Sequence, residues 1–148
     1  MSFLSDVESF PAPKKLRVDG NITALAGEFF VAAELLKREL QVSITFGNTK
    51  HIDLFAHNPK TGRNFTVQVK SLRTKNYFPI REIIPAHIYV FVILNTTHKA
   101  VQYFIVSGKQ LLSDPIKFAY KDDKFSGLHA KVLNEFENMW STFQNVVT

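Results

Sequence analysis

A strong turn signal separates two short segments whose polar residues could carry out chemistry. Residues 58–63 read Asn-Pro-Lys-Thr-Gly-Arg, and apolar residues alternate with polar ones over 51–57 and 64–71. This pattern predicts a β-hairpin. If the turn is symmetric about its centre, four polar side chains share one face of the sheet in directly opposed pairs. The expected pairs are Asp53 with Gln68 and His51 with Lys70.

A glutamate in the preceding segment is expected to face the same region. Residues 22–40 have helical periodicity, and Glu28 lies on the apolar stripe that should face the core. A buried carboxylate costs several kcal/mol unless a cation or a hydrogen-bond donor meets it. Glu34 lies on the polar side of the helix and is expected at the surface. The residues expected on the apolar stripe are Leu25, Phe29, Ala32, Leu35 and Leu36.

These residues allow two interpretations. Glu28, Asp53 and Gln68 would offer oxygen ligands of the kind that Mg²⁺ prefers. A lysine beside such a metal, here Lys70, can orient or activate water and offset charge on a pentavalent phosphate. In the second interpretation, Glu28 and Lys70 form a buried ion pair while Asp53 and Gln68 are simply hydrogen-bonded.

The positive charge of the chain is concentrated in one segment. Its 148 residues include 18 Lys and Arg against 13 Asp and Glu, a formal net charge of +5. Residues 58–82 contain six basic residues and one acidic residue, Glu82, and so carry a net +5 by themselves. Such a segment could contact nucleic-acid phosphates, or it could be a solubilising surface loop. The basic residues are Lys60, Arg63, Lys70, Arg73, Lys75 and Arg81.

The composition argues against several other classes of function. Without cysteine there is no disulfide framework, no thiolate nucleophile and no Cys-ligated zinc, which fits a reducing cytoplasm. The longest apolar run, 88–94, is far shorter than the roughly 20 residues of a membrane-spanning helix. Residues 1–15 lack the basic start and apolar block of a signal peptide. We therefore expect a cytoplasmic protein with no membrane partner.

The first two thirds of the chain predict a central sheet. Strands are expected over 42–46, 88–94 and 102–106, in addition to the hairpin. The unbroken apolar run 88–94 indicates a strand that is buried on both faces. Residues 1–20 are expected to form a loosely attached arm, and 21–148 a single mixed α/β domain in which helices flank the sheet.

The remaining segments are expected to complete this domain. Ser107 should cap a short helix that ends at Leu112, and 114–127 should form a loop. Residues 129–147 have the periodicity of a final helix that packs on the core. Its apolar face would comprise Val132, Leu133, Phe136, Trp140, Phe143 and Val147.

Other candidates for binding are less specific. The irregular stretch 73–85 offers basic and aromatic side chains that could grip a nucleic-acid backbone and stack on a base. A solvated loop with Tyr77 and Phe78 turned inward fits the same residues. His51 could contact phosphate, or could bond a backbone group as strand histidines commonly do. The other histidines have no zinc-like spacing.

Three motifs appear in the order found in a known family. They are Gly27-Glu28 in an apolar helix, Gly47-Asn48-Thr49-Lys50-His51-Ile52-Asp53-Leu54, and Val67-Gln68-Val69-Lys70-Ser71. Together they resemble the PD-(D/E)XK nuclease superfamily, most closely its members with a Gln-x-Lys third motif and a helix glutamate. The layout is similar to small restriction endonuclease-like and Holliday-junction-resolvase-like proteins. The resemblance covers about residues 22–106 and implies a restriction endonuclease-like αβββ(α)β core, with a central mixed sheet flanked by helices.

The resemblance also implies roles for individual residues. Asp53 and Glu28 would ligate Mg²⁺ or Mn²⁺, the Gln68 side chain and the Val69 carbonyl would complete the coordination sphere, and Lys70 would serve the attacking water. Gln68 stands where the family usually has an acidic residue, so the site has one negative charge fewer, for which Glu28 can compensate. Ile52 stands in place of the proline that gives the family its name. DNA would contact His51, Ser71, Arg73, Lys75, Tyr77 and Arg81.

Three functional hypotheses follow. The first is a metal-dependent endonuclease that hydrolyses phosphodiester bonds in DNA. The second is a nuclease-fold module that binds nucleic acid or protein without cutting. The third is a partner-binding domain whose basic segment meets an acidic protein. For the first, the short chain leaves little room for a separate recognition domain, so cutting both strands of a duplex would suggest a homodimer.

Overall fold

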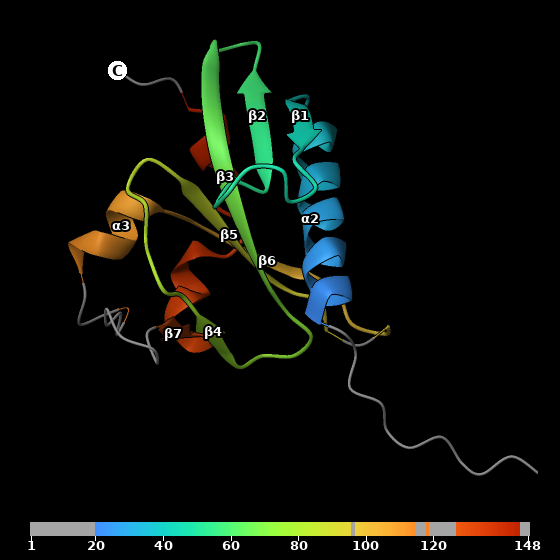
Figure 1. Cartoon of the computed structure of the whole chain (residues 1–148), viewed down its shortest axis with the longest axis vertical. Helices are drawn as coiled ribbons and strands as arrows, with labels where there is room; N and C mark the ends of the chain where they lie inside the picture. Colours follow the sequence, from blue (N-terminus) through green and yellow to red (C-terminus); the bar gives the residue numbers. More distant parts are fainter. Residues whose placement is uncertain (1–19, 96, 115–117, 119–126, 146–148) are drawn as a thin grey trace, which may run out of the picture.

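The computed structural model describes residues 20–95, 97–114, 118 and 127–145. Five strands form a mixed sheet in the order β1-β2-β3-β5-β6, and two more, β4 and β7, form a separate pair. The expected mixed α/β class, with a central mixed sheet, is confirmed (Figure 1). The elements are α2 (Gly20–Lys37), β1 (Gln41–Ile44), β2 (Leu54–Asn58), β3 (Arg63–Leu72), β4 (Tyr77–Pro79), β5 (Ile88–Ile93), β6 (Gln102–Ser107), α3 (Gly108–Ser113), β7 (Gly127–His129), and the 3-10 segments η1 (Ala130–Phe136) and η2 (Trp140–Phe143).

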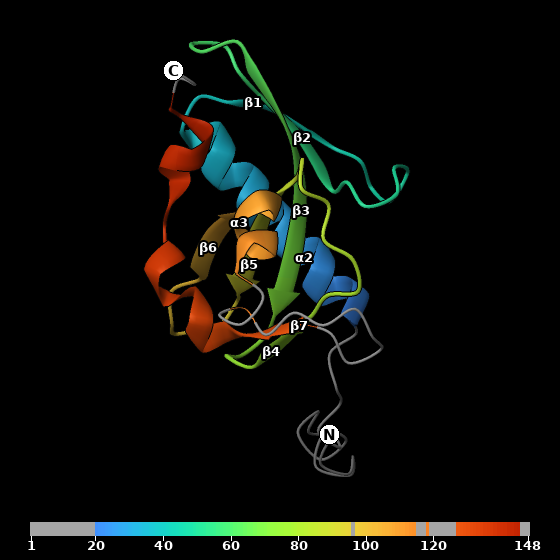
Figure 2. The same ribbon diagram turned by 90° about the vertical axis from the view of Figure 1, so that its left-hand side faces the viewer.

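The central sheet separates two hydrophobic clusters. β5 pairs in parallel with β3 and antiparallel with β6, and every one of its residues is buried, as the apolar run predicted. Val90 belongs to the cluster beneath α2, whereas Phe91 belongs to the cluster formed with β4, α3, β7 and η1. Figure 2 shows α2 on one side of the sheet and α3 on the other. Burial on both faces places β5 at the centre of the domain.

The hairpin has the predicted register over the length of β2. Leu54 pairs with Val67 and Asn58 with Arg63, as a symmetric turn requires. β2 begins only at Leu54, however, and His51 lies in a turn with a φ of +62°. The two expected pairs, His51 with Lys70 and Asp53 with Gln68, are therefore not part of the ladder. The cause is Thr45, whose hydroxyl donates to the Ile52 carbonyl at 2.7 Å and thereby stabilises the reversal between β1 and β2.

Helix α2 begins and ends two to three residues earlier than predicted. Its last residue is Lys37, not Leu40, because Glu39 adopts a φ of +67°. The Leu40 N–H then donates to the Leu35 carbonyl at 3.1 Å, and both side chains are buried in the same cluster. This bond and hydrophobic contact are those of a Schellman C-cap.

The prediction of which side of α2 is buried was partly wrong. Ala32 and Leu35 are buried as expected, but Leu25, Phe29 and Leu36 are 42%, 49% and 55% exposed. Gly27 explains the difference, because the helix packs so closely on β3 there that a Cβ atom would lie 1.7 Å from the Ser71 hydroxyl. The side of α2 that packs closest to the sheet therefore consists of four residues spaced about one turn apart. They are Thr23, Gly27, Val31 and Leu35.

The C-terminal region is not the continuous helix that its periodicity predicted. It consists of β7, η1 and η2, and the chain bends between η1 and η2 at Asn138, whose φ is +56°. The Asn138 N–H donates to the Tyr103 carbonyl at 2.9 Å, so β6 competes for a group that a continuous helix would use itself. Leu133, Trp140 and Phe143 are nevertheless buried, as their predicted core role requires.

Other expectations are confirmed or lie outside the described residues. Ser107 caps α3 with a complete capping box. The stretch after β3 includes β4, where Phe78 is buried and Tyr77 is 38% exposed. No helix within the described ranges is long and apolar enough to cross a membrane. The predicted arm, except Gly20, lies outside the described residues, as do most of the predicted loop 114–127 and Val147.

Candidate functional site

Asp53 lies at the point where β2 leaves its ladder with β3. Its N–H donates to the Val67 carbonyl at 2.9 Å, which continues the ladder by one further bond. The next N–H of β3 that faces β2, that of Val69, has no backbone acceptor on the departing chain. Asp53 Oδ2 accepts this N–H instead, at 2.7 Å. The bond holds the carboxylate beside Val69, which lies between Gln68 and Lys70 in the sequence.

Glu28 shares this position with Asp53. A hydrogen bond joins the two side chains, and the pKa of Glu28 is raised from 4.5 to about 7. Burial is the largest cause, followed by the negative charge of Asp53 and the hydrogen bond between the two groups. Near pH 7 the Glu28 carboxyl group is therefore protonated in part of the molecules.

The amine of Lys70, on β3, lies close enough to Asp53 to interact with its charge. Burial lowers the pKa of its amine, and the negative charge of Asp53 partly opposes that shift. Among the described residues, no ion pair joins Lys70 to Glu28. The buried ion pair between Glu28 and Lys70 is therefore not formed. Each of these two residues interacts with Asp53 instead.

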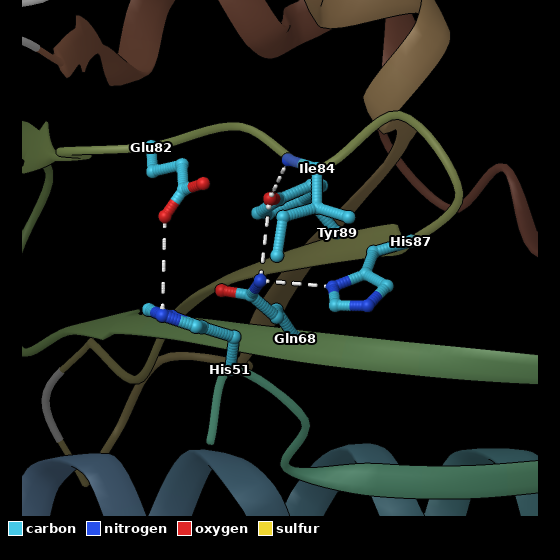
Figure 3. Close-up of polar contacts among 6 residues, drawn as sticks. All are labelled: His51, Gln68, Glu82, Ile84, His87 and Tyr89. Atoms are coloured by element: carbon cyan, nitrogen blue, oxygen red, sulfur yellow. Dashed lines mark hydrogen bonds and ion pairs between the residues drawn. The ribbon is translucent and has the colours of Figure 1, made fainter.

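Gln68 is buried, and His87, just before β5, and Tyr89, in β5, orient its side-chain amide. Its Nε2 lies 3.0 Å from His87 Nδ1 and donates to the Tyr89 hydroxyl oxygen at 3.3 Å. Both amide hydrogens are thus directed at His87 and Tyr89, and Figure 3 shows the amide oxygen pointing away from His87 toward the side of His51. The oxygen is the atom that a metal ion could use.

The segment that carries His87 is itself held in place. The Tyr89 hydroxyl accepts the Ile84 N–H at 2.9 Å, and the Gly108 N–H donates to the His87 carbonyl at 2.8 Å. A Cβ atom on Gly108 would lie 2.1 Å from the Ile84 carbonyl oxygen, so only glycine permits this contact. Burial lowers the pKa of His87, the nearby His51 lowers it further, and Asp53 opposes the shift. His87 is therefore mainly neutral at pH 7 and can accept the Gln68 N–H.

Sequence reasoning missed His87 and Tyr89. Tyr89 was part of an apolar run, although a buried tyrosine hydroxyl usually requires a partner and could have drawn attention to it. The partner depends on the parallel register that places Tyr89 beside Gln68, and nothing in the local sequence specifies that register.

The residues expected to contact nucleic acid are not all brought together. His51 lies 3.9 Å from Glu82 and faces the segment that carries His87 (Figure 3). Arg73 donates to the Thr23 hydroxyl at 3.1 Å, at the start of α2. The Ser71 hydroxyl is buried against Gly27 without a hydrogen-bond partner, so it cannot contact a ligand on the Lys70 face. Lys75, Tyr77 and Arg81 are exposed along the segment between β3 and β5.

The basic segment is also divided in space. Lys60 forms an ion pair with Glu39 at 2.7 Å. Arg63 lies over the Phe65 ring at 4.8 Å and donates to the Asn145 carbonyl. These two positive charges lie at the hairpin turn, at the opposite end of β3 from Arg73, so the excess charge does not form one continuous patch around Asp53.

The donor set fits a hard divalent cation. The carboxyl groups of Glu28 and Asp53 lie side by side, and a cation can take the place of the Glu28 proton between them. The Gln68 amide oxygen is the third candidate side-chain ligand. Within the described ranges, no three His, Cys, Asp or Glu side chains gather closely enough to hold a metal ion, so an amide or backbone oxygen is needed to complete a site. No protein-family model matches the chain, and no curated protein matches it either.

We expect Glu28→Gln to remove a pH-dependent loss of stability. Because the folded protein holds the Glu28 proton up to about pH 7 and the unfolded chain releases it near 4.5, stability falls as pH rises through this window. In metal-free buffer above pH 7, the variant should be more stable by on the order of 1 to 2 kcal/mol, a value reduced for partial solvent screening.

Urea unfolding at pH 4.5, 6 and 8 measures this difference. Glu34→Gln is the matched control, since Glu34 lies on the same helix but pairs with Arg38 at the surface. If Glu28→Gln and Glu34→Gln give parallel curves of stability against pH, the pKa of Glu28 is not raised in the folded protein.

Proposed function

We propose that this protein is a metal-dependent endonuclease that hydrolyses phosphodiester bonds in DNA. The observation that carries the proposal is the convergence on Asp53 of a second carboxyl group, Glu28, and an amine, Lys70, from separate elements. Paired carboxylates favour a divalent cation, and an amine beside them is suited to managing a proton or the negative charge of a phosphate. Mg²⁺ or Mn²⁺ is the proposed cofactor.

The arrangement of elements supports a restriction endonuclease-like core. Helix α2 is followed by the three antiparallel strands β1, β2 and β3, and β5 then adds in parallel beside β3. This is the αβββ order expected of PD-(D/E)XK nucleases. The motif residues lie where β2 ends and the Asp53 side chain replaces the backbone as the acceptor of the Val69 N–H.

The proposed reaction assigns one task to each group. A divalent cation held at this site would supply Lewis-acid chemistry to the scissile phosphate and to the attacking water. Glu28, Asp53, the Gln68 amide oxygen and the Val69 carbonyl would hold the ion. The water oxygen forms a bond to phosphorus as its proton passes to the neutral form of Lys70, which the lowered pKa makes more accessible. The bond from phosphorus to the leaving oxygen breaks, and that oxygen takes a proton from solvent.

We expect Lys70→Ala and Asp53→Asn to abolish cleavage. Plasmid, branched and single-stranded DNA would be incubated with Mg²⁺ or Mn²⁺, and each variant should be at least about 100-fold slower than the wild type. Lys109→Ala is the matched control because Lys109 is exposed on α3, away from Asp53. Cleavage that persists equally in all variants would come from a contaminant and would refute the assignment. A wild type that cuts none of the substrates would favour the binding-module hypothesis.

Tyr89→Phe should weaken metal binding although Tyr89 is not itself one of the proposed metal ligands. The change removes the oxygen that accepts a Gln68 amide hydrogen and the Ile84 N–H, so the amide is free to rotate. Loss of such an orienting partner typically costs 10- to 100-fold in metal affinity, here measured by Mn²⁺ titration. Tyr103→Phe is the control, because Tyr103 is also buried but packs against Trp140. Equal Mn²⁺ affinities in the two variants would show that the amide orientation is irrelevant.

A further inference from the structure

A pocket of about 490 Å³ lies over β1, β2 and the first half of β3. Its volume is within the range of small-ligand sites. The side chains on this face belong to two cross-strand rows, which the register aligns as Ser43–Phe55–Thr66 and Gln41–His57–Asn64. Phe65 and Ala56 belong to the cluster beneath α2. The pocket is therefore on the opposite face of the sheet from α2, the face that also carries Gln68.

The pocket exists because the layer formed by β4, α3, β7 and η1 does not extend over the β2–β3 hairpin. The cluster formed with β4, α3, β7 and η1 covers β5 and β6, and its margin toward the hairpin is the segment that contains Ala86. Figure 1 shows the β2–β3 hairpin extending beyond α3, β4 and β7. The outward face of the hairpin is consequently left open, and Phe55 at its centre is 42% exposed.

The pocket adjoins the proposed active site. Thr66 is two residues before Gln68 on β3, and Phe55, which pairs with Thr66, is the second residue of β2. Side chains two residues apart point to the same face of a sheet, and their rows are about 7 Å apart. A ligand group in the pocket would thus lie next to Gln68, one of the residues proposed to hold the metal ion.

The lining has the chemistry of a site for a flat, uncharged group. No Asp, Glu, Lys or Arg lines it, so a phosphate or a carboxylate would find no counter-charge there. The Phe55 ring offers an aromatic face, and hydrogen-bonding groups surround it, including a His57 Nδ1 to Asn64 Oδ1 contact of 2.6 Å. Aromatic faces bordered by such groups bind nucleobases by stacking and edge contacts.

We propose that this pocket holds an unpaired nucleobase of the strand being cut, stacked on Phe55 beside the scissile phosphate. The inference rests on the proposed nuclease function and narrows its substrate class. A base inside a duplex is already stacked on both faces and must leave the helix to enter such a pocket. The preferred substrates are therefore single strands, flaps or junctions with unpaired nucleotides.

Phe55→Ala tests the pocket, with Phe30→Ala as a matched control. Phe30 is 43% exposed on α2, on the other side of the sheet, so both variants remove a phenyl ring of equal exposure. Fluorescence anisotropy in a Lys70→Ala background with Mg²⁺ would compare a labelled single strand with a blunt duplex. Phe55→Ala should weaken single-strand binding by about 5- to 150-fold, the range found for one stacked base, and duplex binding by less than about twofold.

Equal single-strand binding by the two variants would overturn the proposal, as would an equal loss on duplex. If Phe55→Ala does not fold, a 5-iodouracil oligonucleotide can be photo-cross-linked to the Lys70→Ala protein. An adduct at Phe55 supports the pocket, and adducts only elsewhere refute it. Failure of the pocket proposal can be distinguished from failure of the nuclease proposal. If the wild type cuts no substrate but binds single strands in a Phe55-dependent way, the nuclease proposal is refuted and the pocket proposal stands. If the protein cuts single strands and Phe55→Ala changes neither their binding nor their cleavage, the pocket proposal is refuted and the nuclease proposal stands.

Discussion

The hydrogen bond from the Val69 N–H to the Asp53 carboxylate is the interaction on which the candidate site depends. It forms where the backbone of β2 turns away, so a side chain replaces a lost ladder acceptor. This bond holds Asp53 against the strand that carries Gln68 and Lys70. Burial raises the pKa of Glu28, and the negative charge that this bond places nearby raises it further. Polar groups from α2, from the residue before β2 and from β3 therefore lie together at the end of the β2–β3 ladder.

Packing on the two faces of the sheet completes this arrangement. On one face, the close contact of Gly27 with β3 brings Glu28, the next residue on α2, to the level of Asp53. On the other face, Tyr89 and His87 hold the Gln68 amide with its oxygen directed away from them. The same outer layer ends at the segment before β5 and leaves the hairpin face uncovered. Site and pocket therefore result from one asymmetry: only part of the sheet is covered on both sides.

The sequence predicted local features well and long-range ones poorly. Turn chemistry and alternation predicted the hairpin register over β2 but not before Leu54, and the unbroken apolar run predicted the buried strand β5. Apolar periodicity failed for α2 because a glycine, invisible to a hydrophobic pattern, determines the face that packs most closely. It failed again at Asn138, where β6 takes a backbone donor from the expected helix. The orientation of Gln68 required the parallel pairing of β3 with β5, which no local pattern encodes.

The central claim is that Glu28 and Asp53 form one site that a divalent cation can occupy in place of the Glu28 proton. Anomalous diffraction from crystals grown with Mn²⁺ above pH 7 tests it most directly. We expect a single strong peak within about 2.6 Å of a carboxylate oxygen from each residue, with the Gln68 amide oxygen facing it. Carboxyl groups that remain hydrogen-bonded to each other at saturating Mn²⁺, with no peak between them, would contradict the account.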